Sequence, residues 1–169
     1  LLIKNFDPKL IKTELNILKK VGAKIKLFKN SIHIKGPEKI KSIRNITTKE
    51  YPGFPTDLAP QFMVLLCKAS GTSSITENIF QGRFLHAMEL QRLGAKISIK
   101  NRTAKIEGNT NFKAAEVMSS DLRASAALIL AGIVSKGNTI VTRVYHCDRG
   151  YEKIENKLKK IGVKIKRIK

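Results

Sequence analysis

Tyr51-Pro-Gly-Phe-Pro-Thr-Asp57-Leu-Ala-Pro-Gln-Phe62 is the stretch that decides how this chain folds. Proline fixes φ and is tolerated only in the first turn of a helix, so Pro55 and Pro60 predict a helix that begins at or just before Asp57. The apolar residues that follow, up to Ala69, continue this helix. An acidic side chain is therefore presented at a rigid helix N-terminus, where it is either an ordinary N-cap or a group with a chemical role.

A short pattern recurs three times along the chain. It reads Leu18-Lys-Lys-Val-Gly22-Ala-Lys-Ile25, then Leu90-Gln-Arg-Leu-Gly94-Ala-Lys-Ile97, then Leu158-Lys-Lys-Ile-Gly162-Val-Lys-Ile165, at intervals of 72 and 68 residues. Each copy is typical of an amphipathic helix that is stopped by glycine and followed by a strand.

A second pattern lies between these copies and also recurs. Thr56-Asp57-Leu58 opens one apolar helix and Ser120-Asp121-Leu122 opens another, and the two aspartates are 64 residues apart. Together the patterns predict repeat units at roughly residues 23–94 and 95–162, with residues 1–22 as the tail of an earlier unit. The first residues, Leu1-Leu-Ile-Lys4, read as a strand without an initiating Met, and we expect a missing upstream portion.

Each unit is predicted to run helix, strand, strand, helix, strand, which makes the fold class α/β. The strands show alternating apolar residues, at 31–35, 95–99 and 104–107. Two helices carry almost no charge and should be buried, at 62–69 and 124–133. Three others show one apolar stripe and one charged face, at 9–21, 84–93 and 151–161. Because each unit needs neighbours to cover its faces, we expect buried helices surrounded by sheets, with further helices outside.

The formal charge of +20 raises the question of nucleic-acid binding. The distribution argues against a dedicated site, because 25 of the 33 basic residues are lysines scattered along the whole chain, and only residues 153–169 form a dense basic tail. The chain has no Trp and three Tyr, and it has no aromatic run on which bases would stack. No apolar run reaches the length of a membrane span. We expect a globular cytoplasmic protein with no membrane partner and no specific nucleic-acid partner.

Neither cysteine indicates a metal site or a disulfide framework. Cys67 lies inside a predicted apolar helix, where an inert thiol is usual, and Cys147 lies in His146-Cys147-Asp148, which lacks zinc spacing. We expect no metal and no cofactor. His86 is a candidate acid or base, but a lone histidine near a helix start is more often a packing or capping residue.

Several charged residues stand near predicted helix starts, where exposed N–H groups and the macrodipole suit phosphate or carboxylate binding. Arg123 lies close to Asp121, and Arg83 and Arg149 each precede a charged-face helix at corresponding points of successive repeats. Such arginines could converge on one anion, because a planar guanidinium pairs with carboxylate or phosphate oxygens. Alternatively, each forms a surface or cap ion pair.

Four motifs occur in a fixed order along the chain. They are Pro52-Gly-Phe-Pro-Thr-Asp57-Leu with Gln61-Phe62, Thr76-Glu-Asn-Ile79-Phe with Arg83-Phe-Leu-His86, Asp121-Leu-Arg-Ala-Ser-Ala-Ala-Leu128, and Tyr145-His-Cys-Asp148-Arg-Gly-Tyr-Glu152. In these motifs the chain resembles the UDP-N-acetylglucosamine 1-carboxyvinyltransferase family of bacterial peptidoglycan synthesis, one of the enolpyruvyl transferases. The similarity runs over essentially the whole chain.

The resemblance implies a two-domain inside-out α/β barrel built of six βαβαββ-type units, with helix N-termini facing a cleft between the domains. This chain would supply about two and a half units, which is most of one domain, and the second domain would be absent. The family reaction adds the 3-hydroxyl of UDP-N-acetylglucosamine to carbon 2 of phosphoenolpyruvate and then eliminates phosphate through a tetrahedral intermediate.

The resemblance also implies roles for single residues. Asp57 corresponds to the aspartate that contacts the sugar hydroxyl and acts as its base, and Ile79 to a backbone contact with the UDP-sugar. Arg149 corresponds to an arginine on the phosphoenolpyruvate side. The remaining cleft residues, which hold the intermediate, correspond to Arg83, Asp121 and Arg123.

Part of the family's site has no counterpart here. The general-acid cysteine lies on a loop of the other domain, and neither Cys67 nor Cys147 corresponds to it. We therefore expect the chain alone to be inactive, to require the missing N-terminal part of the same enzyme, and to be aggregation-prone or partly molten. Two alternatives stay open: a catalytically inactive half-barrel that binds anions or a nucleotide-sugar, and a basic nucleic-acid-associated protein.

Overall fold

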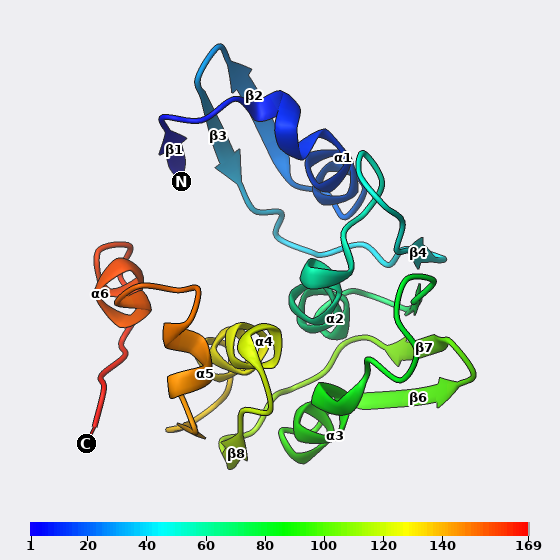
Figure 1. Cartoon of the computed structure of the whole chain (residues 1–169), viewed down its shortest axis with the longest axis vertical. Coiled ribbons are helices and arrows are strands. Elements are labelled where there is room, and N and C mark those ends of the chain that lie inside the picture. The colour runs from blue at the N-terminus through cyan, green and yellow to red at the C-terminus, as the bar shows by residue number, and fades with distance from the viewer. Residues whose placement is uncertain (169) are drawn as a thin grey trace.

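A computed structural model describes residues 1–168 of the chain (Figure 1). The helices are α1 (Lys12–Lys20), α2 (Ala59–Cys67), α3 (Leu85–Arg92), α4 (Leu122–Ile133), α5 (Tyr145–Asp148) and α6 (Ile154–Lys159), with 3-10 turns η1 (Pro8–Ile11) and η2 (Thr56–Leu58). The strands are β1 (Leu2–Lys4), β2 (Lys24–Phe28), β3 (Ser31–Lys35), β4 (Ile46–Thr47), β5 (Thr72–Thr76), β6 (Lys96–Lys100), β7 (Thr103–Glu107), β8 (Glu116–Met118) and β9 (Ile140–Thr142).

The strands form three separate sheets. The largest has the order β4-β5-β7-β6, in which β4 pairs parallel with β5 and the other pairs are antiparallel. Its strands and helices follow one another as β4-α2-β5-α3-β6-β7, which is the βαβαββ unit implied by the resemblance. The other sheets have the orders β1-β3-β2 and β8-β9. The α/β fold class is confirmed.

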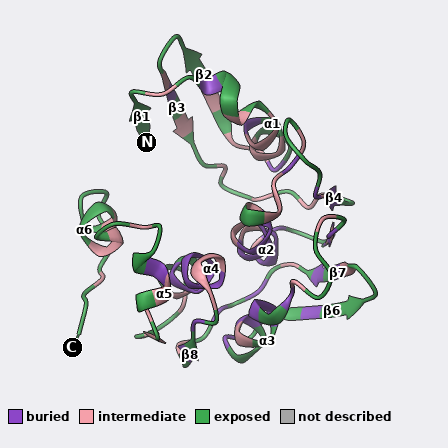
Figure 2. Cartoon of the chain, in the orientation of Figure 1, coloured by how far each residue is buried: buried purple, intermediate pink, exposed green. Residues whose placement is uncertain are grey.

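Helices α2 and α4 form the centre of the molecule, where they pack on each other (Figures 1 and 2). Their sequences are almost wholly apolar, so burial against neighbouring elements keeps most of their surface out of water. The burial expected for residues 124–133 is incomplete, because Leu130 and Ile133 of α4 are exposed. Met63 and Leu66 of α2, and Ala127 and Leu128 of α4, are fully buried. This central pair sets where the two Asp-bearing helix starts lie, because both helices begin next to each other.

Helices α1 and α3 lie at the surface with one face against the core, as expected, whereas α6 contributes no buried residue. In α3, for example, Ala87 and Leu90 are fully buried whereas Leu85 and Met88 are exposed. The last predicted helix is shorter than residues 151–161, since α6 begins only after Lys153, whose φ is +44°, and ends before Gly162. No described helix has the length and apolarity needed to cross a bilayer.

Three elements were not expected from the sequence. Strands β4 and β8 are two and three residues long and precede the buried helices, each pairing parallel with the strand that follows its helix. Such short runs carry too few residues for alternation to be visible. Helix α5, a single turn, is likewise too short for its period to appear in the sequence.

Candidate functional site: a carboxylate between two arginines

Asp57 lies in the η2 turn, two residues before α2 begins at Ala59. Its carboxylate caps neither element, since neither N-terminus has a side-chain cap hydrogen bond in the described residues. The N-cap interpretation is therefore wrong for Asp57. The side chain is 53% exposed and is directed toward two guanidinium groups instead.

The first guanidinium belongs to Arg123, in the first turn of α4. Its Nε donates to Oδ1 of Asp57 at 2.9 Å and its Nη2 donates to Oδ2 at 2.8 Å, which is the paired geometry that a planar guanidinium makes with a carboxylate. Asp121 fixes the start of this helix, because its Oδ1 accepts from the backbone N–H groups of Arg123 and Ala124. Asp57 and Arg123 are 66 residues apart and meet because α2 and α4 begin side by side.

The second guanidinium belongs to Arg83, in the loop before α3. Its Nη2 lies 3.0 Å from Oδ1 of Asp57, and its Nη1 donates to the hydroxyl of Thr56 at 3.1 Å. The guanidinium also lies over the ring of Phe80, 4.6 Å from the ring centre, where the face of an aromatic ring attracts a cation. Arg83 is thus held from three sides.

The electrostatics of the cluster follow from these contacts. The hydrogen bond from Arg123 and the charges of Arg123 and Arg83 hold the pKa of Asp57 below its usual value, although partial burial acts the other way. The same hydrogen bond raises the pKa of Arg123. Burial would raise the pKa of Asp121, but the N–H groups of Ala124 and Arg123 outweigh it and lower that pKa. Both carboxylates are therefore ionised near neutral pH.

Sequence reasoning missed a second carboxylate, that of Glu77. It is 2% exposed and accepts hydrogen bonds from the hydroxyls of Thr48 and Thr56 and from the backbone N–H groups of Ile79 and Phe80. A signal for its burial was present in the sequence. Glu77 continues the alternation of β5, in which Ser73 and Ile75 face the interior, so the period places it on the buried face.

His86 is close to this cluster but takes no hydrogen bond through its buried Nε2 among the described residues. The side chain is 5% exposed at the start of α3. Burial lowers the pKa of His86 to about 4, against a smaller raising effect from Asp121. At neutral pH it is an uncharged packing residue, which agrees with the more common of the two interpretations.

The family model described as EPSP synthase (3-phosphoshikimate 1-carboxyvinyltransferase) matches residues 1–158. The chain belongs to the EPSP synthase family. Among curated relatives, UDP-N-acetylglucosamine 1-carboxyvinyltransferase of Pelagibacter ubique is 62% identical over 98% of this chain and 40% of the relative. The protein of the same name from Desulfosudis oleivorans is 48% identical over the same shares. The chain thus spans about two-fifths of the length of these relatives.

Solved structures show the same fold. The enolpyruvyl transferase NikO from Streptomyces tendae superposes with a TM-score of 0.89 at 24% identity, over 98% of this chain and 39% of that one. An EPSP synthase from Acinetobacter baumannii superposes with a TM-score of 0.77 at 18% identity, over 99% of this chain and 42% of that one. The enolpyruvyl transferase fold of the family is therefore present in this chain.

Within this family fold, two of the predicted site residues make no hydrogen bond or ion pair with Asp57, Arg83 or Arg123 in the part of the chain that the structure describes. Arg149 is the exposed residue that follows α5, and its side chain makes no hydrogen bond or ion pair within residues 1–168. Ile79 is half-buried, and its N–H already donates to Glu77 at 2.7 Å, so a backbone contact to a ligand would have to use its carbonyl.

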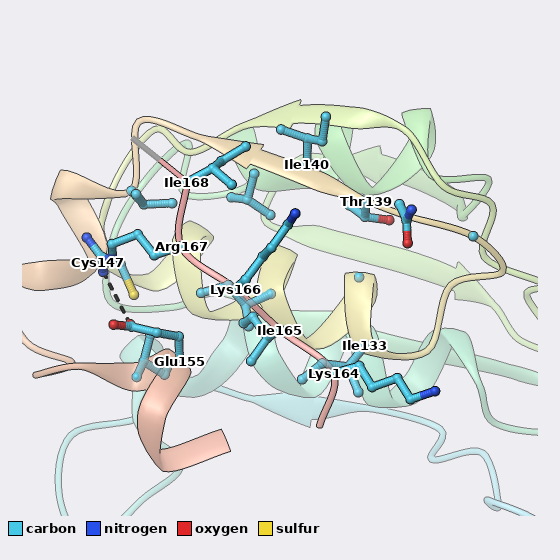
Figure 3. A pocket seen from close by; sticks show the side chains of 17 residues that line it. Ile133, Thr139, Ile140, Cys147, Glu155, Lys164, Ile165, Lys166, Arg167 and Ile168 are labelled. Carbon is cyan, nitrogen blue, oxygen red and sulfur yellow. Dashed lines mark hydrogen bonds and ion pairs between the residues drawn. The ribbon is translucent and has the colours of Figure 1, made fainter. Parts of the chain in front are cut away.

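A separate groove lies elsewhere on α4. It measures about 470 Å³ and runs between the later turns of α4, strand β9 and residues 164–168 (Figure 3). Ile133 is about 15 Å along the helix from Arg123, at 1.5 Å per residue, so the groove is separate from the Asp57 cluster.

Neither cysteine is part of the Asp57 cluster. Cys147 lines the groove beside β9, and burial raises its pKa. Cys67 is fully buried, and burial raises its pKa to about 12.

Proposed function

We propose that this chain is part of an enzyme that transfers the enolpyruvyl group of phosphoenolpyruvate to the 3-hydroxyl of UDP-N-acetylglucosamine, with release of phosphate, in the cytoplasm. The observation that carries the proposal is the carboxylate of Asp57 between the guanidinium groups of Arg83 and Arg123. Relatives named for this reaction, at 62% and 48% identity, support the choice of substrates.

The cluster has the groups that such a reaction needs. A hydroxyl nucleophile needs a base within hydrogen-bond reach, and the half-exposed Asp57 can accept its proton. A substrate with both a phosphate and a carboxylate needs several cations, and arginine pairs with each of these anions. In this proposal Asp121 fixes the first turn of α4 and thereby places Arg123, while Arg149 and Ile79 contact the substrates from outside the cluster.

The depressed pKa of Asp57 places a condition on this mechanism. A carboxylate bound by two arginines is a weak base, because both charges favour its ionised form. When an anionic substrate takes over hydrogen bonds of Arg123, the pKa of Asp57 rises and the carboxylate becomes a better proton acceptor. Substrate binding would thus activate the base at the moment it is needed.

The test is Asp57→Asn in the intact enzyme that contains this chain. Because Asn keeps the shape but cannot accept a proton, turnover should fall roughly 10²–10⁴-fold while the KM for UDP-N-acetylglucosamine changes little. Asp7→Asn is the matched control, since Asp7 is an exposed aspartate that caps η1. Equal losses in turnover and in substrate affinity would reject the base role.

A second candidate is a half-barrel that binds an anion or a nucleotide-sugar without catalysis. It is favoured by two observations. The chain spans about two-fifths of the relatives' length, and none of its residues corresponds to the family's general acid. The intact mass of the native protein separates the two. A mass well over twice 18.9 kDa supports the enzyme, and a mass near 18.9 kDa supports the binding module.

A further inference from the structure

Glu77 is a buried carboxylate whose partners are all uncharged. A carboxylate removed from water is strongly destabilising unless hydrogen bonds replace its hydration. Its Oε1 accepts from the hydroxyl of Thr48 at 2.8 Å and from the N–H groups of Ile79 at 2.7 Å and Phe80 at 3.0 Å. Its Oε2 accepts from the hydroxyl of Thr56 at 2.6 Å. Hydrogen bonds outweigh burial, so the pKa of Glu77 is lowered and the group is ionised.

An ionised carboxylate sets the direction of the Thr56 hydroxyl. A carboxylate can only accept, so the single proton of the hydroxyl must point to Glu77. The lone pairs of Thr56 then face the other way, where Nη1 of Arg83 donates to them at 3.1 Å. Glu77 therefore makes Thr56 an acceptor at the place where the guanidinium needs one.

Glu77 also holds the second neighbour of this guanidinium. Phe80, whose ring lies under Arg83, is tied to Glu77 through its backbone N–H. Arg123 is held differently, because every side-chain hydrogen bond or ion pair that it makes within residues 1–168 goes to Asp57. One arginine is thus fixed by the fold, and the other is fixed by the carboxylate alone.

We propose that Glu77 is a positioning residue that, through Thr56 and Phe80, fixes Arg83 against Asp57 and leaves Arg123 as the arginine that exchanges between Asp57 and an anionic substrate. The role in catalysis rests on the proposed enolpyruvyl transfer. The positioning of Arg83 does not, since it concerns only contacts within this chain.

The experiment measures the pKa of Asp57 by carbon-13 NMR titration of its carboxyl group in the intact protein, and the pH profile of kcat beside it. Thr56→Val removes the acceptor for Arg83 but keeps the shape of the side chain. Once Arg83 is loosened, the pKa of Asp57 should rise, the acid limb of the kcat profile should move to higher pH, and kcat should fall roughly 10-fold to 100-fold. Thr56→Ser restores the hydroxyl and should restore all three.

Thr48→Val is the matched control, because Thr48 also donates to the carboxylate of Glu77 but, unlike Thr56, makes no hydrogen bond with Arg83 in the described residues. It should lower the melting temperature and leave the titration of Asp57 unchanged. Other charged or titratable groups that face Asp57 and its arginines are Asp121, Tyr151 and His86, and none of them is altered. If Thr56→Val does not fold, Glu77→Gln should give the same upward shift.

Two failures are distinguishable. If the unaltered intact protein transfers no enolpyruvyl group, the proposed function is rejected, while the titration still tests the positioning role. If Thr56→Val or Glu77→Gln leaves the pKa of Asp57 where it was, the positioning role is rejected, whatever the activity. A change in Thr48→Val as large as that in Thr56→Val would also reject it.

Discussion

Asp57 and Asp121 occupy the same place in the two repeats and have different tasks. Asp121 has an extended backbone, and α4 begins at the next residue, so its Oδ1 accepts from two helix N–H groups. At Asp57 the 3-10 turn η2 intervenes before α2, and the carboxylate is left for the arginines. A single turn of backbone therefore separates an ordinary cap from a candidate base.

This difference predicts different costs of substitution. Asp121→Ala removes a cap that accepts two N–H groups and should lower the free energy of unfolding by about 1 kcal/mol. Asp57→Ala removes only exposed ion pairs and should change it by less than about 0.5 kcal/mol. Urea unfolding of the intact protein measures both. A larger loss for Asp57→Ala would mean that its ion pairs support the fold.

His86 should make stability depend on pH. Its pKa is about 4 in the folded state and 6.5 when exposed, so between these values the unfolded state binds more protons and stability falls as pH falls. Between pH 7 and pH 5 the loss from this one residue should be about 2 kcal/mol. Urea midpoints of His86→Leu should lose this dependence. His33→Leu, at an exposed strand position, should keep it, and an unchanged slope in His86→Leu would contradict the account.

At the scale of elements, two glycines follow corresponding strands but differ in the space available for a side chain. Gly108 follows β7 and runs against the end of α2, where its N–H donates to Gly71 and a Cβ would overlap the carbonyl oxygens of Ala69 and Gly71. Gly36 follows β3, and no atom lies within 4 Å of the place where its Cβ would be. The repeat is the same in sequence and different in packing.

Substitution should show this difference directly. Gly108→Ala forces the strand away from α2 and should lower the free energy of unfolding by roughly 1–3 kcal/mol or more, in the range of overpacked cores. Gly36→Ala should be close to neutral. Thermal melts of the two variants, made in the same background, compare them, and equal losses would show that backbone freedom rather than space decides at both sites.

Much of this architecture could be predicted from the sequence. The buried and amphipathic helices and the hairpin strands were visible in their periods, and the repeats placed Asp57 and Asp121 at equivalent helix starts. The approach of Arg83 and Arg123 to Asp57 was not visible, because residues 26 and 66 positions away meet only through the packing of α2 on α4. Glu77 was missed because an acidic residue after a strand is usually solvated, and because two of its four partners, Thr48 and Thr56, come from distant parts of the sequence.

At the scale of the whole molecule, the exposed surface is larger than the chain length requires. It amounts to 10,794 Å², whereas a folded monomer of 18.9 kDa is expected to expose about 8,300 Å². Exposed apolar residues gather at the groove beside β9, including Ile133, Ile140 and Ile168. Apolar surface of this chain is therefore left exposed to solvent.

The isolated chain should therefore bind a hydrophobic dye and unfold without a sharp transition, as partly molten proteins do. Dye fluorescence and a thermal melt of residues 1–169 measure this, with the intact protein as the control. A sharp cooperative melt with low dye binding would show that the chain covers its own apolar surface well enough to stand alone.

The four-stranded sheet takes β4 and β5 from before residue 94 and β6 and β7 from after it. The boundary between the two sequence repeats therefore falls inside this sheet and not between two sheets. A shortened, permuted or recombined version that is cut at residue 94 would leave half a sheet on each fragment. A cut between β3 and β4, within residues 36–45, keeps the block β4-α2-β5-α3-β6-β7 whole. Crossover points for chimaeras with other family members should accordingly lie between hydrogen-bonded sheets and not at the boundary of the sequence repeat.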